Sequence, residues 1–533
     1  MFRIAIITSN KKIDYWQILA LNHANKNFKV ETILNCNNSF SKRNYFKNFL
    51  YYVLNLIFYN GKLFKKYKVE KIFDTIQIIN FNCIRKNNWE FLPEDILNLI
   101  KNKNLDLVFK FGMNLLKIPE LEVTKYGFFS YHHGDSKYFR GRPACFYEFL
   151  NNTNSIGVVI QKLSNNIDKG QVFAKSYCKL YNYSFKKTVN NTYKNSTFLL
   201  NTFFINLKNQ KKYSFEKNFG KLYFLPSNVL VAKLIINNII FLIQKIFYGL
   251  FFYKKWNISI QKNNLFDKKE ITKFKIKVSP NSKINNLKYL FYSDPFFINN
   301  NEIILEAYDK YKSYGIINIY DLDKKNFTFE NILKSRKHSS FPSIFKDNNK
   351  IFFLPEIANW SNPKIFELNS KLSISKEINL VGLEKLKLID SVLFKERGIY
   401  YLFTGFKNNS LDVCHLYYSD SKIGQYTLHP SSPIISDPIG SRMAGNIIRI
   451  ENKKYRLGQN NSGKYGNGIC IYEILEINKI NYKEKFIKSI KLYDFYGPHS
   501  IDISGQKIVL DYYTEKFSLF AGFRRLNQML KNV

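Results

Sequence analysis

Two histidines stand side by side in the stretch FFSYHHGDSKYFRGRP, which begins at Phe128. Only seven histidines occur in the 533 residues, and this pair is followed closely by an acid and two arginines. An imidazole takes up or releases a proton near neutral pH, and a neighbouring carboxylate favours its charged form. The stretch is therefore a candidate site for proton-transfer chemistry. A charged loop on the surface of an ordinary domain is the alternative.

The elements around this stretch predict a parallel β-sheet with helices on its faces. Short β-rich runs occur at RIAIITS, FKVETILNC, DTIQIINF, LDLVFKFG and YGFFSYHHG, and helical segments such as PEDILNLIKNK separate them. Strands that alternate with helices are typical of parallel sheets. Ligands of such sheets bind beyond the carboxyl ends of the strands. The last of these runs ends at the histidines, so position also indicates a site there.

Three motifs in order resemble the catalytic domain of the formyltransferase family: DLVFKFGMNLL, YGFFSYHHGDSKYFRGRP and SIGVVIQKLSNNIDKGQVF. That family includes the methionyl-tRNA, glycinamide ribonucleotide and sugar N-formyltransferases. The resemblance covers about residues 1–180 and implies a Rossmann-like α/β domain. It also implies that 10-formyltetrahydrofolate is the co-substrate, whose formyl carbon is attacked by an amine.

The resemblance assigns roles to particular residues. It places the family's histidine at His132 and its aspartate at Asp168, which would orient the imidazole. Ser130 stands where the family has an asparagine, and a hydroxyl is a shorter donor to an oxyanion than an amide. The folate would lie against Met113, Asn114, Leu115, Leu116, Asn166 and Ile167. The substrate would lie against His133, Asp135, Arg140, Gly141 and Arg142.

Each of these roles has an alternative. His132 and Asp168 can be a hydrogen-bonded polar pair in a turn, and the arginines can be solvated loop charges instead of phosphate ligands. With Ser130 in place of asparagine, the domain can also use another acyl donor or have lost its activity.

The second part of the chain is repetitive from about residue 275. Five segments share an apolar pair, a polar turn and a β-rich run: SDPFFINNNEIILEA, FPSIFKDNNKIFFLPE, IDSVLFKERGIYYLFTG, AGNIIRIENKKYRLGQ and PHSIDISGQKIVLDYY. Their starts near Asp294, Phe341, Asp390, Ala444 and His499 are 47, 49, 54 and 55 residues apart. A period near fifty residues predicts the blades of an all-β five-bladed propeller. A β-sandwich would supply the strands but not the repeat.

The segments SDPFF, FLPEI, LIDSVLF, SRMAGNIIR and GPHSID resemble the propellers of glycoside hydrolase family 43. They resemble more closely the N-terminal domain of plant glucosamine inositolphosphorylceramide transferases, over about residues 275–520. The hydrolase resemblance implies a base at Asp294 and a second aspartate at Asp390, whereas Glu356 lies out of order for the acid. Arg442 and His499 also open blades and are expected at the propeller axis. Alternatively, the aspartates only bond backbone in their turns.

Composition limits the partners and the compartment. The net charge is +40, but only 12 of the 81 basic residues are arginines, and the lysines are spread along the whole chain. Nucleic-acid-binding proteins cluster their charge and favour arginine. A specific nucleic-acid partner is therefore not expected. Anionic membranes and phosphorylated substrates are the partners that this charge would attract. Six scattered cysteines predict no disulfide framework and no metal site, in a cytoplasmic protein.

The predicted organisation is a formyltransferase-like α/β domain at 1–225, a connecting amphipathic helix at 226–262 and the propeller at 263–533. The apolar stretch KLIINNIIFLIQKIFYGLFFY has the length of a bilayer span. Two asparagines, a glutamine and a lysine interrupt it, and such residues are costly in lipid. We expect a helix packed between two domains. A membrane-surface helix, with peripheral membrane contact, is the alternative, ahead of a true span.

The sequence thus predicts an enzyme that transfers a formyl group from 10-formyltetrahydrofolate to an amine of a sugar or sugar nucleotide, beside a glycan-handling propeller. Joining an N-acyl-transfer fold to a sugar-handling fold in one chain favours a glycan substrate. Three alternatives stay open. They are a glycan-binding module with an inactive formyltransferase-like domain, a glycosidase or sugar transferase acting through the propeller, and a methionyl-tRNA formyltransferase-like activity.

Overall fold

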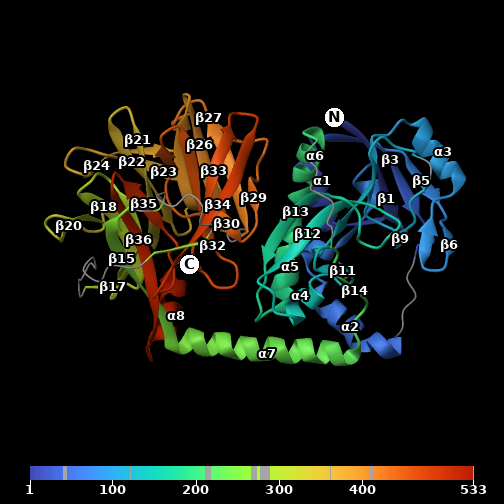
Figure 1. Cartoon of the computed structure of the whole chain (residues 1–533), viewed down its shortest axis with the longest axis horizontal. Helices are drawn as coiled ribbons and strands as arrows, with labels where there is room; N and C mark the ends of the chain where they lie inside the picture. Colours follow the sequence, from blue (N-terminus) through green and yellow to red (C-terminus); the bar gives the residue numbers. More distant parts are fainter. Residues whose placement is uncertain are drawn as a thin grey trace. The chain divides into compact units, whose positions relative to one another are not determined.

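The computed structural model describes residues 1–39, 45–119, 122–210, 218–263, 265, 273–276, 288–360, 362–407 and 412–531. The chain forms two compact units, Met1–Leu242 (unit 1) and Ile243–Val533 (unit 2). Figure 1 shows that unit 1 combines a sheet with helices, whereas unit 2 consists almost entirely of strands. The protein therefore has more than one domain and is mostly β.

A sheet of nine strands, counted over the described residues, forms the centre of unit 1. Its parallel part has the order β5 (Ile78–Phe81), β3 (Phe28–Cys36), β1 (Phe2–Ser9), β8 (Leu107–Lys110) and β10 (Gly127–His132). β12 (Ser155–Lys162) and β13 (Val172–Lys179) continue it antiparallel, and β2 (Lys12–Asp14) and β4 (Lys66–Lys68) extend it past β1. The predicted strands are all present, and β10 ends at His132.

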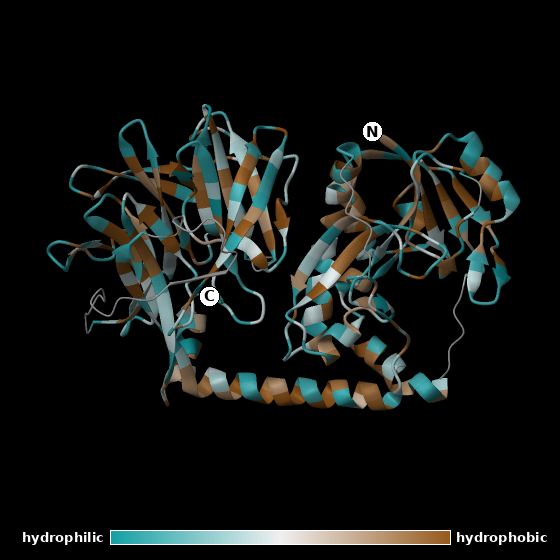
Figure 2. Cartoon of the chain, viewed as in Figure 1, coloured by the Kyte–Doolittle hydropathy of each residue, from teal (hydrophilic) through white to brown (hydrophobic). Residues whose placement is uncertain are grey.

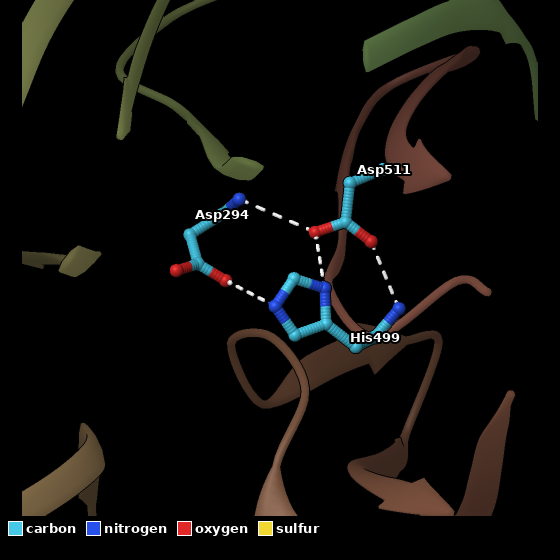
Figure 3. A group of neighbouring side chains, drawn as sticks. All are labelled: Asp294, His499 and Asp511. Atoms are coloured by element: carbon cyan, nitrogen blue, oxygen red, sulfur yellow. Dashed lines mark hydrogen bonds and ion pairs between the residues drawn. The ribbon is translucent and has the colours of Figure 1, made fainter. Parts of the chain in front are cut away.

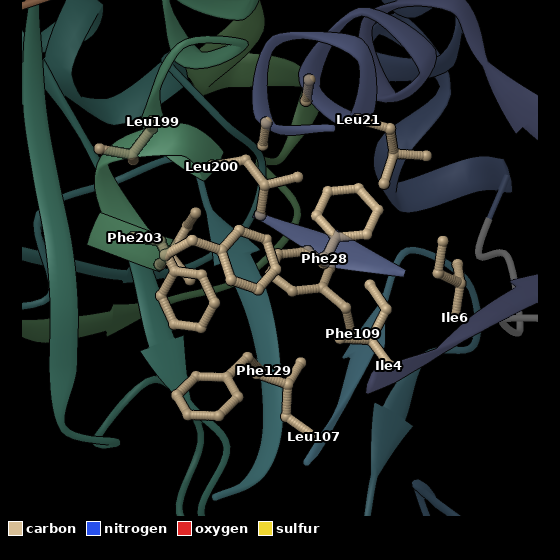
Figure 4. Packing of buried hydrophobic residues seen from close by; sticks show 14 of the residues in the cluster. Ile4, Ile6, Leu21, Phe28, Leu107, Phe109, Phe129, Leu199, Leu200 and Phe203 are labelled. Carbon is tan, nitrogen blue, oxygen red and sulfur yellow. The ribbon is translucent and has the colours of Figure 1, made fainter. Parts of the chain in front are cut away.

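Helices and short ribbons complete unit 1. The helices are α1 (Tyr15–Ala24), α2 (Tyr45–Phe58), α3 (Glu94–Asn102), α4 (Phe146–Leu150), α5 (Phe185–Ser196) and α6 (Leu199–Lys208). The short strands are β6 (Ile84–Lys86), β7 (Trp89–Phe91), β9 (Leu115–Leu116), β11 (Phe139–Gly141) and β14 (Lys221–Tyr223). Figure 4 shows the main core, where Leu21 of α1 and Phe203 of α6 pack over sheet residues such as Phe109. This packing fixes the carboxyl end of β10, where the paired histidines lie.

The helix α7 (Asn228–Phe251) differs from the expectation for the connecting segment. Of its residues only Val231 and Leu234 are buried. The expected packing of this helix between two domains stays a prediction. α7 is, among the described residues, the one helix long and apolar enough to cross a membrane, and Figure 2 shows its many hydrophobic residues. The predicted helix also ends early, because FYKKWNISIQK forms the strand β15 (Phe252–Lys262), where aromatic and β-branched residues recur.

Unit 2 contains five sheets within the described residues. The first has β17 (Tyr289–Phe297), β18 (Glu302–Asp309), β19 (Tyr314–Asp321) and β20 (Asn326–Phe329). The second has β21 (Ser339–Asp347), β22 (Lys350–Ile357), β23 (Lys364–Leu368) and β24 (Ile374–Asn379), and the third has β25 (Leu388–Glu396), β26 (Ile399–Phe406), β27 (Val413–Ser419), β28 (Thr427–Leu428) and β29 (Ile435–Ser436).

The last two sheets include strands that the sequence did not predict. The fourth has β16 (Lys273–Ile276), β30 (Ile439–Met443), β31 (Ile448–Ile450), β32 (Lys453–Asn460), β33 (Ile469–Ile477) and β34 (Tyr482–Leu492). The fifth joins β15 to β36 (Lys507–Phe517) and β35 (Ile501–Ser504), and the helix α8 (Ala521–Lys531) follows. All five predicted hairpins are found, but β30 already pairs with β32 in the fourth sheet, before the predicted start at Ala444.

Candidate functional site

A cavity of about 410 Å³ lies within unit 2, and residues from all five of its described sheets line it. It brings together the five residues that the sequence placed at the axis of the second part: Asp294, Glu356, Asp390, Arg442 and His499. The lining residues that were not predicted include Trp256, Glu306, His338 and Tyr465. The cavity therefore collects acids, bases and aromatic rings in one place.

Backbone bulges orient the side chains of two acidic residues that line the cavity. Asp294 and Asp390 have left-handed φ angles of 50° and 46°, and Phe341 has the corresponding angle of 45° in the second sheet. Each lies where the first strand of its sheet shifts register against the second strand. A bulge of this kind redirects a side chain, and aspartate tolerates the left-handed region well. The same backbone irregularity thus orients the side chains of Asp294 and Asp390 towards the cavity that they line.

His499 lies between two carboxylates, as Figure 3 shows. Its Nδ1 is 2.6 Å from Oδ2 of Asp511, and its Nε2 is 3.3 Å from Oδ1 of Asp294. Asp511 also accepts hydrogen bonds from the backbone N–H groups of Asp294 and His499, at 3.2 and 2.8 Å. Burial opposes a charge on His499, but the charges of Asp511 and Asp294 outweigh it and raise its pKa to about 9. The imidazole is therefore a cation at neutral pH.

Asp390 forms the second charged group of the cavity. Its Oδ2 lies 2.6 Å from Nε of Arg442 and accepts a hydrogen bond of 2.8 Å from Nε2 of Gln459. The backbone N–H of Asp390 donates to Oε2 of Glu356 at 3.3 Å. Arg442 thus neutralises Asp390, and the same short stretch of backbone positions the carboxyl group of Glu356.

Two glutamates in the cavity wall hold protons unusually well. Burial, and then the charge of Asp390, raise the pKa of Glu356 to about 8. Burial also raises the pKa of Glu306 to about 7, although Ser293 donates a hydrogen bond of 2.8 Å to it. Burial raises the pKa of Asp294 well above its usual range. A carboxylic acid that is protonated at neutral pH can act as a general acid.

Aromatic rings form part of the same wall. The ring of Trp256 lies 4.0 Å from that of His499, and the guanidinium of Arg442 lies 5.5 Å from the centre of the Tyr465 ring. Trp360 packs against Phe366 and is not among the lining residues of the cavity. Trp256 was missed because it lies in β15, a segment that the sequence analysis predicted to be helical.

Asp294, His499 and Asp511 also carry the donor atoms of a cation site, one each, within 4.8 Å of one another. A metal would have to displace a proton from the imidazole of His499, whose pKa is about 9. The short contact to Asp511 and the contact to Asp294 are explained by the charge of this imidazole.

The two central residues of the predicted formyl-transfer site do meet in unit 1. Nδ1 of His132 lies 3.5 Å from Oδ2 of Asp168, and its Nε2 lies 3.0 Å from the carbonyl oxygen of Phe139. Asp168 also accepts hydrogen bonds from the N–H of Gly141 and from Nε2 of Gln161, at 2.8 and 2.9 Å. The cavity that His132 lines measures about 10 Å³, enough for about one water molecule.

The predicted substrate-binding residues have partners inside unit 1. Asp135 accepts hydrogen bonds from Tyr177 and Lys175, at 2.7 and 3.2 Å. Arg140 donates to the carbonyl oxygens of Gly220 and Ile167, at 2.8 and 3.2 Å. The ring of His133 stacks on Tyr193 at 4.1 Å, and burial lowers its pKa to about 3. Arg142 lines the same small cavity as His132. A substrate-binding role of these residues stays a prediction.

The remaining predicted residues of unit 1 lie at several places. Ser130 is buried in β10, beside Lys110 of β8 in the sheet register. The backbone N–H groups of Met113 and Asn114 donate to Ser9 and Glu90, whereas Leu115 and Leu116 form β9 and pair with β7. Asn166 is exposed and Ile167 half-buried in the turn before Asp168.

The second part of the chain matches a known family. Residues 278–493 match the family model described as glucosamine inositolphosphorylceramide transferase 1, N-terminal. This match covers less than half of the chain. It confirms the resemblance of the repeated part to these transferases, whereas the resemblance of unit 1 to formyltransferases stays a prediction.

Curated relatives carry the same name. Glucosamine inositolphosphorylceramide transferase 1 of Oryza sativa subsp. japonica is 32% identical over 156 residues, which are 28% of this chain and 20% of the relative. The Arabidopsis thaliana protein is 33% identical over 160 residues, again 28% of this chain and 20% of the relative. The chain thus matches about a fifth of the length of these relatives.

The chain also has low similarity to solved structures. An exo-β-1,3-galactanase from Clostridium thermocellum is 14% identical, with a TM-score of 0.32, over 38% of this chain and 51% of the galactanase. An N-formyltransferase from Helicobacter canadensis is 13% identical, with a TM-score of 0.29, over 58% of this chain and 97% of the formyltransferase. These identities and TM-scores are too low to assign a function to this chain.

Proposed function

We propose that the cavity of unit 2 binds a saccharide and that the chain is a carbohydrate-active enzyme whose chemistry takes place there. The observation that carries this proposal is the gathering of Asp294, Glu356, Asp390, Arg442 and His499 around one cavity of about 410 Å³. A volume of this size is in the usual range of small-ligand sites. Carboxylates and an arginine can bond sugar hydroxyls, and aromatic rings can stack on a sugar face.

Proton transfer at a glycosidic bond would use two acids with different tasks. Glu356, with a pKa of about 8, is protonated at neutral pH and can give its proton to a leaving oxygen. Asp294 is held by the charged His499 at 3.3 Å and by the backbone N–H of Phe341, which donates to its Oδ2 at 3.2 Å. Asp294 would accept the proton of the attacking group in its ionised form, which the charge of His499 favours against burial. The charge of Asp390 adds to burial in raising the pKa of its neighbour Glu356, whereas Arg442, which pairs with Asp390, opposes this.

The arrangement of the five sheets supports a five-bladed propeller as part of the same proposal. First strands of successive sheets contact one another, β17 with β21, β21 with β25, and β25 with β30. The backbone N–H of Ile501 donates to the carbonyl oxygen of Ala444 at 2.7 Å, and β35 contacts β17. A closed ring of blades would place the cavity on its axis.

The family match supports a sugar transferase over a simple binding module. The relatives are named as transferases and with glucosamine in their name. We infer from these names that this chain also belongs to an enzyme that transfers an amino sugar or a related sugar.

Saccharide binding by the full chain tests the proposal. Asp390→Asn should lower the affinity for the saccharides that wild type binds on a glycan array by about tenfold or more, because it removes a charged partner from the wall. Asp347→Asn is the matched control, because Asp347 is also a buried acid, paired with Lys395 and Tyr400, and does not line the cavity. Equal binding by wild type and Asp390→Asn, with the fold intact by circular dichroism, would refute the site.

Formyl transfer by unit 1 is a second candidate, which the 3.5 Å contact between His132 and Asp168 favours. The reaction would move the formyl group of 10-formyltetrahydrofolate to the amine of a sugar or sugar nucleotide. The cavity beside His132 would have to open first, because it holds about one water molecule. Mass spectrometry of amino-sugar nucleotides incubated with the co-substrate tests it. A gain of one formyl group that disappears in His132→Ala supports this candidate, and no gain in wild type contradicts it.

A further inference from the structure

Apolar side chains recur along α7 at alternating intervals of three and four residues. They occupy the a and d positions of a heptad repeat: Val229, Ala232, Ile236, Ile239, Ile243, Ile246 and Leu250. We call these seven residues the α7 seam. The alternation holds at every step of the helix from its second residue onward. Such a repeat is typical of helices that pack along one another in coiled coils.

The α7 seam faces solvent in the part of the chain that the structure describes. Its isoleucine and leucine side chains are between 49% and 60% exposed. The contacts of α7 with unit 1 use other residues, because Val231 and Leu234 are buried and Asn238 bonds backbone groups. At about 3.6 residues per turn, these three residues lie on the side of the helix opposite to the seam. A long exposed apolar face of this kind marks an interaction surface.

The residue types of the α7 seam favour a bundle of several helices. Its two central a positions and its two central d positions are all isoleucine. In parallel coiled coils, isoleucine at both kinds of position favours three or four helices over two. Apolar residues also occupy the flanking e and g positions, which helices of a bundle bury as well. These flanking residues are Ile235, Ile240, Leu242 and Phe247, which are between 41% and 55% exposed.

The exposed area is sufficient for a stable assembly. About half of each large seam and flanking side chain is exposed. Together they offer on the order of 800 Å² per copy, which is what each partner buries in a stable interface of standard size. A heptad seam needs a partner helix with the same repeat, and another copy of this chain always supplies one.

A bilayer fits α7 less well than a second copy does. Asn238 accepts a hydrogen bond of 2.9 Å from the N–H of Phe185 and donates one of 3.0 Å to the carbonyl oxygen of Tyr183. The part of α7 beyond Asn238, residues 239–251, rises only about 20 Å, whereas a bilayer core is about 30 Å thick. Helices that lie on a membrane are rich in lysine and arginine on their polar face. α7 contains two lysines and no arginine, and its amides are more numerous than its cations.

We propose that copies of this chain assemble through the α7 seam into a parallel bundle of three or four α7 helices. Rotation about one axis relates the copies, so that the same seam residues of each copy meet in one layer. The assembly goes beyond the proposed saccharide site of unit 2 and does not depend on it.

Light scattering after size-exclusion chromatography tests the assembly with the full chain in detergent-free buffer. Wild type should have the mass of three or four chains. Ile239→Glu with Ile246→Glu keeps good helix formers but places charges inside the bundle. It should raise the concentration needed for assembly by about hundredfold or more. The matched control is Ile423→Glu with Ile480→Glu, at residues of unit 2 that are 61% and 69% exposed. A wild-type mass of one or two chains, or equal dissociation in both double variants, overturns the proposal.

Cysteine cross-linking tests the parallel arrangement separately. The six native cysteines are buried, so an added thiol on α7 reports on its own neighbours. Ile246→Cys places thiols of adjacent copies in one layer, and diamide should oxidise them to a disulfide that links the chains. Gln244→Cys is the matched control on the same turn, outside the seam, and should give about tenfold less linked product.

Two results of these experiments would overturn the assembly. The first is equal cross-linking at positions 244 and 246, which would mean that the seam does not lie between copies. The second is wild type that stays a single chain and sediments with phosphatidylcholine vesicles, which would make a bilayer the occupant of the α7 seam.

Discussion

Nε of Arg442 lies 2.6 Å from Oδ2 of Asp390, although the two residues belong to different sheets of unit 2. Both side chains are nearly buried, at 12% and 5% exposure. Burial and then the charge of Asp390 raise the pKa of Glu356 to about 8, whereas the charge of Arg442 lowers it. The two charges of this ion pair thus act in opposite directions on the acid that is proposed as the proton donor.

Removal of the arginine should destabilise unit 2. Arg442→Met leaves Asp390 charged and without its ion-pair partner in the cavity wall, which costs about 3–5 kcal/mol for a buried pair. Urea unfolding of the full chain measures the change in the free energy of unfolding. Arg449→Met is the control, since Arg449 pairs with Glu396 but is 52% exposed, and should cost at most about 1 kcal/mol. Similar costs for both variants would show that the Arg442 pair is not effectively buried.

Turnover should fall at alkaline pH as Glu356 loses its proton. A general acid works in its protonated form, so kcat/KM should decline as the pH rises through about 8, the pKa of Glu356. Glu356→Gln should lower kcat/KM by about 10²–10⁴ and remove this alkaline limb. If the variant keeps the limb, the proton donor is another group, and Glu306, with a pKa of about 7, becomes the next residue to replace.

The stability of unit 2 should also fall as the pH rises. The pKa of His499 is raised from 6.5 to about 9. Its stabilising contribution is therefore complete below 6.5 and lost as the pH rises through 9. His499→Asn should flatten the dependence of the urea midpoint on pH over this interval. His338→Asn is the control, because burial lowers the pKa of His338 to about 4 and leaves it neutral there. An unchanged slope in His499→Asn would mean that the imidazole is not charged.

Asp168 should matter for the stability of unit 1. Its carboxylate accepts hydrogen bonds from Gly141 and Gln161, and its backbone has a left-handed φ of 50°. Asp168→Ala removes both acceptors and strains the backbone, which should cost about 2 kcal/mol or more. Asp168→Asn keeps an acceptor and tolerates the same φ, so it should cost less. If Asp168→Ala melts at the wild-type temperature, the contacts of this carboxylate do not stabilise unit 1.

The strands and hairpins could be predicted because they depend on local patterns. Alternating apolar residues around polar turns identify all five hairpins, and β-rich runs identify the parallel strands of unit 1. β30 escapes prediction because IGSRM is short and contains a glycine at a φ of 97°. β15 escapes because it directly follows an apolar helix without a turn signal.

The candidate site could be predicted only in part. Asp294, Asp390 and His499 open repeated segments, so their common location follows from the repeat. Asp511 and Glu306 lie inside ordinary strand patterns, and their approach to the cavity depends on strand pairing between distant segments. In unit 1 the motif order brings His132 to Asp168, but no sequence pattern shows that Arg140 bonds the carbonyls of Gly220 and Ile167.

Turnover of saccharides by the full chain, followed by mass spectrometry, tests most directly where the chemistry takes place. Wild type, Glu356→Gln and His132→Ala are compared on the same substrates. The saccharide site of unit 2 predicts that Glu356→Gln abolishes the sugar-transfer product and that His132→Ala leaves it unchanged. A product that survives in Glu356→Gln and disappears in His132→Ala would contradict it.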